Sequence, residues 1–170
     1  MMNYQHYDYF YNYNNNFECL NNMIEIERLT KDNKLTCDLC GVKNRFYSET
    51  MLWKTPDILV IQLKRFINNE YGIISHKINN NVIYPLTLDI ENYFDKNSSH
   101  IKSFKYNLIG INIHLSSGKN INFGHYVSFV KNKLNSSWYI YNDESPIIKI
   151  SENELNHNNA YMLFYIREKY

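Results

Sequence analysis

A histidine and an asparagine flank two consecutive strand-like segments of this sequence, and their residue types could carry out proton-transfer chemistry. His125 opens the segment 125–131, which is rich in β-branched and aromatic residues, and Asn142 ends the segment 138–142. Turn-forming residues fill positions 132–137, which predicts a β-hairpin. An asparagine amide oxygen can accept the proton of one imidazole nitrogen, leaving the other nitrogen to act as a base.

The centre of the turn decides which residues of this hairpin oppose each other. Folding about Lys133 and Leu134 opposes Phe129 with Trp138, Val127 with Ile140, and His125 with Asn142. Opposed residues have Cβ atoms about 4.5–5.5 Å apart, so His125 and Asn142 are expected to hydrogen-bond. Gly124 lacks a Cβ, which lets another chain or a substrate approach the backbone beside the histidine. The spacing alone also fits a polar pair at a sheet edge with no catalytic role.

Composition narrows the class of protein. The 170 residues suffice for one domain with a core, and 18 Lys and Arg against 17 Asp and Glu give a net charge of +1. Without a basic run, a nucleic-acid partner is not expected. No apolar run is long enough for a membrane span, and the start of the chain lacks the pattern of a secretory signal. Three cysteines do not form a disulfide framework, so a cytoplasmic or nuclear location is expected.

Strands are expected to outnumber helices. Residues 1–16 are low in complexity and predict a disordered tail, and residues 17–29 predict an amphipathic helix. Helical turns are expected at 89–94 and at 151–154, the latter with a capping box. Strands are expected at 46–53, 57–66, 82–88, 106–115 and 160–167, in addition to the hairpin. The predicted fold class is α+β, dominated by an antiparallel sheet.

Two of these strands carry specific expectations. The near-continuous apolar run 57–66 predicts a central strand buried on both faces. The run 106–115 alternates, with Ile109, Ile111, Ile113 and Leu115 on one face, which predicts a half-buried strand. His114 lies at the end of this strand and is interpreted as a structural histidine.

A CxxC motif followed by glycine, Cys37 to Gly41, has the geometry of one half of a zinc knuckle. Zinc prefers four ligands, and the sequence has no second CxxC. Cys19 is the third thiol. Cys37 and Cys40 are therefore candidate metal ligands, but no bound cofactor is expected.

Several motifs, in order along the chain, resemble the ubiquitin-specific proteases, a family of papain-like thiol deubiquitinases. They are the CxxC turn, LKRF at 63–66, GHY at 124–126 followed by a tryptophan strand and Tyr-Asn-Asp, and AYMLFY at 160–165. The resemblance implies that His125 is the general base, that Asn142 orients it, and that Asp143 assists, around the oxyanion. It also implies that ubiquitin or a ubiquitinated protein is the partner.

The rim of the cleft would then be the loop 116–123 with Gly124, Tyr126 and Trp138, which we expect to contact the ubiquitin tail. The family's nucleophile lies in a box such as G-N-T-C-Y, and this sequence has no such box. Cys19 stands in NNFECLNN, without the glycine and Asn-Thr of that box.

The resemblance therefore covers residues 17–170 and corresponds to the C-terminal half of the catalytic domain: the palm and part of the fingers, without the thumb. Three alternatives remain open. The chain is one part of a deubiquitinase whose thumb and cysteine box come from elsewhere, such as a separate chain; it is a catalytically inactive module that binds ubiquitin; or it is a remnant without function.

Overall fold

The computed structural model describes residues 16–169, with gaps at 31–32, 45, 69–70, 72–73, 99–102, 117–123 and 156–157. The predicted tail 1–16 lies outside the described residues, apart from Asn16, which begins the first helix. The predicted rim loop 116–123 also lies outside them, apart from Ser116.

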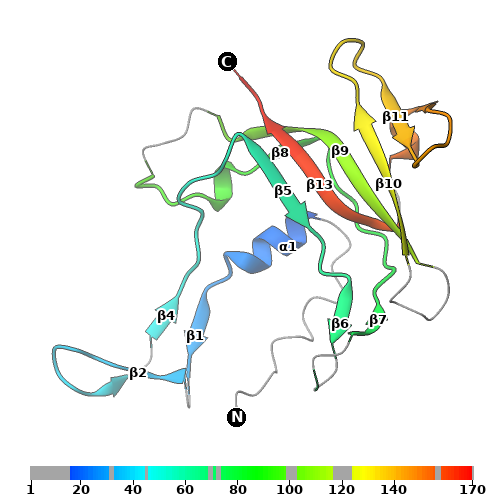
Figure 1. Cartoon of the computed structure of the whole chain (residues 1–170). Helices are drawn as coiled ribbons and strands as arrows, with labels where there is room; N and C mark the ends of the chain where they lie inside the picture. The colour runs from blue at the N-terminus through cyan, green and yellow to red at the C-terminus, as the bar shows by residue number, and fades with distance from the viewer. Residues whose placement is uncertain are drawn as a thin grey trace.

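One antiparallel sheet dominates the described chain, in the strand order β12-β11-β10-β9-β13-β5, with β8 pairing with β9 (Figure 1). Its strands are β5 (Ile58–Gln62), β8 (Thr87–Asp89), β9 (Lys105–Ser116), β10 (Gly124–Lys131), β11 (Trp138–Tyr141), β12 (Ile148–Ile150) and β13 (Ala160–Arg167). The prediction of a mainly antiparallel β fold with few helices is confirmed.

Smaller elements surround this sheet. They are α1 (Asn16–Met23), the pair β1 (Glu27–Leu29) and β4 (Phe46–Ser48), the hairpin β2 (Leu35–Thr36) and β3 (Lys43–Asn44), the hairpin β6 (Phe66–Asn68) and β7 (Ile74–Lys77), and the 3₁₀ helices η3 (Glu91–Tyr93) and η4 (Glu152–Glu154). The predicted helix 17–29 is too long. Residues 24–27 alternate isoleucine and glutamate, which favours extended backbone, and β1 pairs with β4 instead. The predicted capping box of η4 is present.

The core lies on one face of the sheet, which packs against the segments around β8 and η3 and against α1 (Figure 1). Its largest fully buried side chains are Trp138, Tyr106, Tyr165, Leu88, Ile90, Leu108, Ile111, Ile113 and Leu163. In β9 the predicted face holds for Ile111 and Ile113, whereas Leu115 is 37% exposed at the end of the strand. Nearer the start of the strand, Leu108 replaces Ile109 in the core. The ladder between β13 and β9 is irregular there, and such a bulge shifts the alternation by one residue.

β5 is an edge strand, so the prediction of a central strand buried on both faces is wrong. Leu59 and Ile61 pack against the core, whereas Ile58 is 53% exposed and Val60 is 44% exposed. The apolar run identified a strand, but its burial depends on what covers the second sheet face. Within the described residues, β5 pairs with β13 alone.

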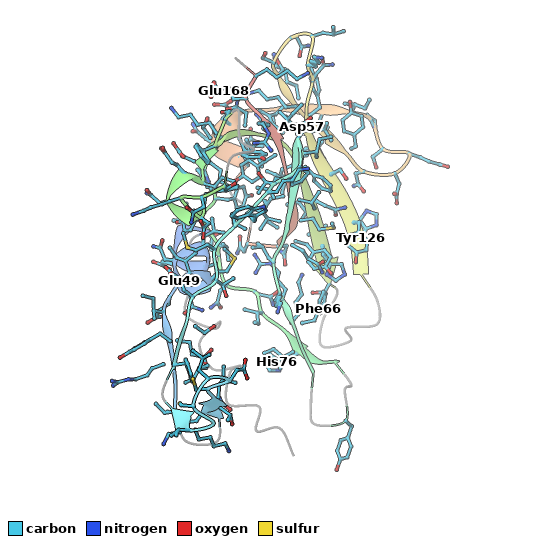
Figure 2. All side chains as sticks on the ribbon, turned by 90° about the vertical axis from the view of Figure 1, so that its left-hand side faces the viewer. Glu49, Asp57, Phe66, His76, Tyr126 and Glu168 are labelled. Atoms are coloured by element: carbon cyan, nitrogen blue, oxygen red, sulfur yellow. The ribbon has the colours of Figure 1, made fainter. Side chains whose placement is uncertain are left out.

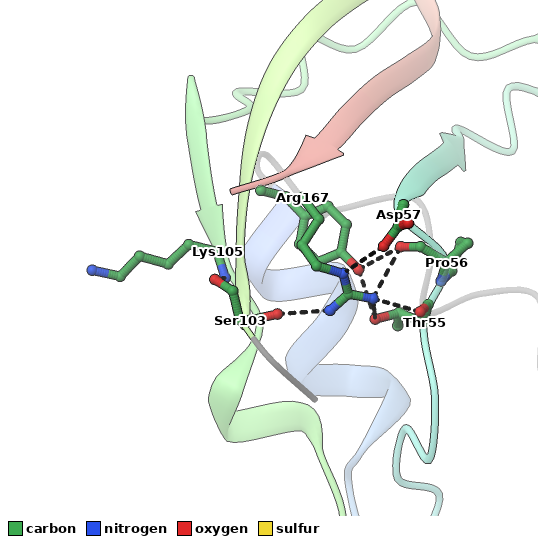
Figure 3. A network of polar contacts seen from close by, with 7 residues as sticks. Thr55, Pro56, Asp57, Ser103, Lys105 and Arg167 are labelled. Atoms are coloured by element: carbon green, nitrogen blue, oxygen red, sulfur yellow. Dashed lines mark hydrogen bonds and ion pairs between the residues drawn. The ribbon is translucent and has the colours of Figure 1, made fainter. Parts of the chain in front are cut away.

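Arg167, the last residue of β13, connects the end of this strand to the segment before β5 through hydrogen bonds (Figure 3). Its guanidinium donates to the carbonyl oxygens of Thr55, Pro56 and Ser103, at 2.5, 3.1 and 2.7 Å. Its Nε lies 3.2 Å from Asp57 Oδ1. The guanidinium also lies over the Tyr106 ring, 5.0 Å from the centroid. One side chain therefore joins β13, β9 and the chain entering β5.

Candidate functional site

The β10–β11 hairpin forms as predicted, but its register differs by two residues. Phe129 opposes Ile140, and Lys131 opposes Trp138. The predicted pairing of Phe129 with Trp138 is therefore wrong. The ladder with β11 begins at Ser128, so the first four residues of β10 pair only with β9.

The turn explains the shift. The Asn132 side-chain oxygen accepts the Leu134 N–H at 2.8 Å, and the Asn132 N–H donates to the Ser137 carbonyl at 2.8 Å. Ser136 has a φ of 55°, in the left-handed region. The asparagine side chain thus starts the turn one residue later than symmetric folding about Lys133 and Leu134 assumes.

His125 and Asn142 nevertheless meet. A shift of two residues keeps every side chain on its original face of the sheet. Asn142 follows the last paired residue of β11 and reaches His125 diagonally, with Nε2 2.5 Å from Oδ1. With Oδ1 as the acceptor, Nε2 carries the proton and the lone pair of Nδ1 is free to take another.

Asp143 lies on the other side of the ring, with its Oδ2 3.7 Å from His125 Nδ1. Its backbone has a φ of 46°, a left-handed conformation that aspartate tolerates better than most residues. The side chains of His125 and Asp143 are 45% and 75% exposed, so water screens the attraction that arises between them when the ring is protonated. The predicted trio of histidine, asparagine and aspartate is thus brought together, with each ring nitrogen near a different oxygen.

Gly124 is closely packed by a residue that the sequence interpretation left out of the site. A Cβ on Gly124 would lie 2.1 Å from Nε2 of His114. The space that we assigned to an approaching chain is therefore filled, on this side of the strand, by the His114 imidazole. The register places His114 opposite Tyr126, hence diagonal to Gly124. Strand alternation in the sequence already places His114 and Gly124 on the same face of neighbouring strands, and this pattern could have indicated their contact.

Aromatic rings from three strands enclose His114. Phe66 on β6 and Tyr126 on β10, both labelled in Figure 2, lie 5.3 and 4.8 Å from its ring centroid, and Tyr161 on β13 lies 6.1 Å away. His114 is 4% exposed and its Nδ1 has no hydrogen-bond partner. Burial, and then the Lys77 charge, lower the pKa of His114. The ring is therefore neutral near pH 7.

The predicted rim residues have different environments. Tyr126 is 50% exposed, beside His125 in the chain. Trp138 is 2% exposed and belongs to the core, so its indole does not reach the surface next to the histidine. Trp138 lies on the core face in either register, and the observed register places it opposite Lys131, farther from His125 than predicted.

Cys19, by its pKa, and Cys37 and Cys40, by their place on the β2–β3 hairpin at the far side of the molecule from β10 (Figure 1), do not match a nucleophile that His125 could activate. Burial and then the Glu18 carboxylate raise the pKa of Cys19, whereas a nucleophile needs a lowered pKa. Cys37 and Cys40 lie on the β2–β3 turn, where the backbone N–H groups of Cys40 and Leu39 lower the pKa of Cys37.

The two turn cysteines do not complete a zinc site. Gly41 has a φ of 69° and donates to the Cys37 carbonyl, which gives the tight turn expected from the motif. In the described part of the chain, no group of three or more His, Cys, Asp or Glu side chains could hold a metal ion. A structural zinc site has four ligands, of which Cys37 and Cys40 could supply two.

Among the described residues, no helix is both long and apolar enough to cross a membrane.

Comparison with known proteins gives consistent matches. The family model "Ubiquitin carboxyl-terminal hydrolase" matches residues 1–165. Ubiquitin carboxyl-terminal hydrolase 9 of Arabidopsis thaliana is 33% identical over 152 residues, which cover 89% of this chain and 16% of that protein. Ubiquitin carboxyl-terminal hydrolase 4 of Mus musculus is 31% identical over 151 residues, covering 88% of this chain and 15% of that protein.

Solved structures agree. A chain of the yeast SAGA DUB module matches with a TM-score of 0.73 and 31% identity, over 90% of this chain and 32% of its own. A chain of the SAGA DUB module bound to ubiquitin aldehyde matches with a TM-score of 0.69 and 29% identity, over 91% of this chain and 34% of its own. The chain thus corresponds to a segment of these larger proteins, and it belongs to the ubiquitin carboxyl-terminal hydrolase family, on its ubiquitin-specific protease branch.

Proposed function

We propose that this chain acts in protein deubiquitination by contributing the histidine and asparagine half of a Cys-His-Asn cleft. The observation that carries the proposal is the His125 ring, whose Nε2 lies 2.5 Å from Asn142 Oδ1 while Nδ1 remains available to a thiol. A histidine oriented by a third group is the arrangement that activates a cysteine nucleophile.

In this proposal His125 Nδ1 takes the thiol proton, and the thiolate attacks the carbonyl carbon at the ubiquitin C-terminus. The imidazolium then returns the proton to the leaving amine, and water hydrolyses the thioester with His125 again acting as base. Asn142 holds the ring orientation throughout. Asp143 stabilises the imidazolium and assists the oxyanion. Tyr126 contacts the ubiquitin tail with its half-exposed side chain, and Gly124 can do so only through its backbone, because His114 fills the space where a side chain would stand.

The thiol must come from outside the described residues, either from a further segment of the same protein or from another chain. The matched structures support this, since this chain covers only 32% and 34% of their length. In architectural terms, residues 17–170 supply the palm and part of the fingers, and the thumb with its cysteine box comes from that other part.

The exposed sheet face supports an incomplete domain. The face opposite the core carries apolar side chains from three strands: Ile58, Val60, Val130 and Ile166, which are 53, 44, 38 and 37% exposed. Exposed apolar surface of this kind marks an interaction site. We assign this face to a further segment of a longer protein, because this chain covers only about a third of the matched structures. The thiol itself must reach the other face, where His125 lies on the same side of β10 as Val127 and Phe129.

Complementation in trans tests the proposal. A fragment carrying the family's thumb and cysteine box is mixed with this chain and assayed with a fluorogenic ubiquitin substrate. Hydrolysis is expected only with both parts, and His125→Ala should abolish it, whereas His76→Ala, which removes an exposed histidine on β7, should not. Absence of hydrolysis despite demonstrated binding of the two parts would contradict it.

A second candidate function is a non-catalytic ubiquitin-binding module acting in the cytoplasm or nucleus. The raised pKa of Cys19 favours it, as does the position of Cys37 and Cys40 on the β2–β3 turn, because the one thiol with a lowered pKa, Cys37, lies on a hairpin far from β10 and His125 (Figure 1). Tight ubiquitin binding by the chain alone, without hydrolysis in any complemented mixture, would select this function.

A further inference from the structure

The strand end that carries His125 is supported on one edge only. Gly124, His125 and Tyr126 pair with Ser116, Leu115 and His114 of β9. On the other edge, the ladder with β11 begins only at Ser128. The loop before β10 lies outside the described residues. Something other than a second neighbouring strand must therefore fix the height and tilt of this strand end.

The His114 imidazole packs directly on the strand end. Its Nε2 lies so close to Gly124 that a Cβ there would be 2.1 Å away, and its Cε1 would be 2.8 Å from the same Cβ. The Tyr126 ring covers the imidazole at 4.8 Å between centroids. The ring thus contacts the residues immediately before and after His125, on the opposite face from the His125 side chain.

The backbone of His114 is anchored independently of β10. Its N–H donates to the Asn159 carbonyl at 2.9 Å, and its carbonyl accepts a hydrogen bond from Lys77 Nζ. The same ammonium donates to Asn159 Oδ1 at 2.9 Å. The β6–β7 hairpin and the segment before β13 therefore hold His114 in place, and a fixed ring can transmit this support to β10.

Burying the His114 imidazole costs free energy that an apolar side chain at this position would not cost. His114 Nδ1 is buried without a partner, and an unsatisfied buried polar atom is unfavourable. A ring of this size directly over a glycine leaves no space for any side chain at position 124. The pair is therefore fitted together, and changing either member changes the position of the strand.

We propose that His114 is a positioning residue for His125: its imidazole, seated on Gly124, sets the start of β10 so that His125 Nε2 reaches Asn142 and Nδ1 faces the cleft. The catalytic meaning of this role rests on the proposed function, but the positioning itself does not.

Nuclear magnetic resonance of the ¹⁵N-labelled chain tests the positioning without any activity. In the native chain the His125 ring nitrogens should report the Nε2–H tautomer, with slow exchange of that proton. His114→Ala should speed the exchange about tenfold and mix the tautomers. Gly124→Ala should do the same, because the methyl group displaces the ring.

The double variant makes the test specific. Because removing the ring frees the space that the methyl group needs, Gly124→Ala combined with His114→Ala should restore the tautomer signal beyond Gly124→Ala alone. Should Gly124→Ala fail to fold, the double variant and His114→Ala still decide. If the tautomer and the proton exchange rate of His125 are unchanged in both His114→Ala and the double variant, the inference is overturned.

A destabilised control separates positioning from general loss of stability. Ile150→Val removes a methylene from a buried residue on β12 and should lower the melting temperature without changing the His125 signals. If Ile150→Val changes them as much as His114→Ala does, the role is merely structural and the inference fails.

In the complemented enzyme, His114→Ala should lower kcat about tenfold with little change in KM for ubiquitin, since the base is misplaced and the binding surface is kept. A complemented mixture that never hydrolyses ubiquitin, combined with the expected resonance changes, would contradict the proposed function and leave the positioning intact. A raised KM for ubiquitin with an unchanged kcat would count against a positioning role for His114.

Discussion

His125 and Asn142 hydrogen-bond across the open end of the β10–β11 hairpin, although the ladder does not pair them. Nε2 lies 2.5 Å from Oδ1, while the last ladder pair in this direction is Ser128 with Tyr141. The contact is therefore made by side chains reaching diagonally beyond the paired region. Its geometry depends on the conformation of residues 142 and 143 after the strand, where Asp143 adopts a positive φ.

Asn142→Ala should lower kcat of the complemented enzyme on the order of 100-fold, because an imidazole without its acceptor rotates away from the productive orientation. Asn142→Asp should retain much of the activity, since a carboxylate oxygen can replace Oδ1. Steady-state kinetics with a fluorogenic ubiquitin substrate measures both. Asn135→Ala, which removes an amide from the turn of the same hairpin, is the matched control and should have little effect.

The chain alone should not cleave a ubiquitin C-terminal amide or ester. Cys37 and Cys40 lie on the β2–β3 turn. Burial and the Glu18 carboxylate raise the pKa of Cys19. Incubation with a fluorogenic ubiquitin substrate measures this directly. Turnover that Cys19→Ser abolishes would show that Cys19 is the nucleophile after all.

Ubiquitin should bind the isolated chain weakly, with a Kd on the order of 100 μM or poorer. An extended tail held on one side gains about 0.5–1.5 kcal/mol per hydrogen bond, and ordering it costs a similar amount per residue. A titration of labelled ubiquitin, with and without the cysteine-bearing fragment, measures the change. Ubiquitin without its last two residues is the control and should not gain affinity from the fragment. Submicromolar binding by the chain alone would favour the binding-module function.

Arg167→Lys should destabilise the fold by about 1–3 kcal/mol, because an ammonium cannot replace the donors that reach Thr55, Pro56 and Ser103 together. Thermal unfolding should show a melting temperature about 2–4 °C lower for each kcal/mol lost. Arg28→Lys is the control, since Arg28 donates to Tyr47 on an exposed surface. Equal shifts for the two variants would contradict the role of Arg167 in joining the strands.

Acid should destabilise the protein through His114. Burial lowers its pKa below the ordinary value of 6.5, so below pH 6.5 the unfolded chain binds a proton that the folded ring does not yet accept. The contribution of His114 to the free energy of unfolding is therefore fully present above pH 6.5. It falls as the pH drops toward the lowered pKa, by at most about 1.4 kcal/mol per pH unit. Urea unfolding at pH 7.5 and 5.5 measures the difference.

His114→Gln should reduce this pH dependence, whatever its effect on stability at neutral pH. His76→Gln, at an exposed position, should leave the dependence in place. A pH dependence unchanged by His114→Gln would show that other groups dominate the acid response.

The sequence by itself determined the elements that carry the site. Alternation and β-branched content located β9, β10, β11 and β13, and period-two alternation also fixed which side chains share a face. That is why the meeting of His125 and Asn142 was predictable despite a wrong register: a slip of two residues changes partners but not faces. The CxxC turn and the capping box of η4 were likewise predictable, because both are local.

Tertiary structure alone decided the remainder, because it depends on contacts between distant segments. The Asn132 side chain set the turn, and with it the pairing of Trp138 with Lys131 in place of Phe129. The irregular ladder between β9 and β13 moved Leu108 into the core in place of Ile109. The same apolar run that predicts a buried central strand became an exposed edge in β5, since burial depends on a neighbour that the run does not encode. The seating of His114 on Gly124 required both the β9–β10 register and the anchoring from β7, which no local pattern specifies.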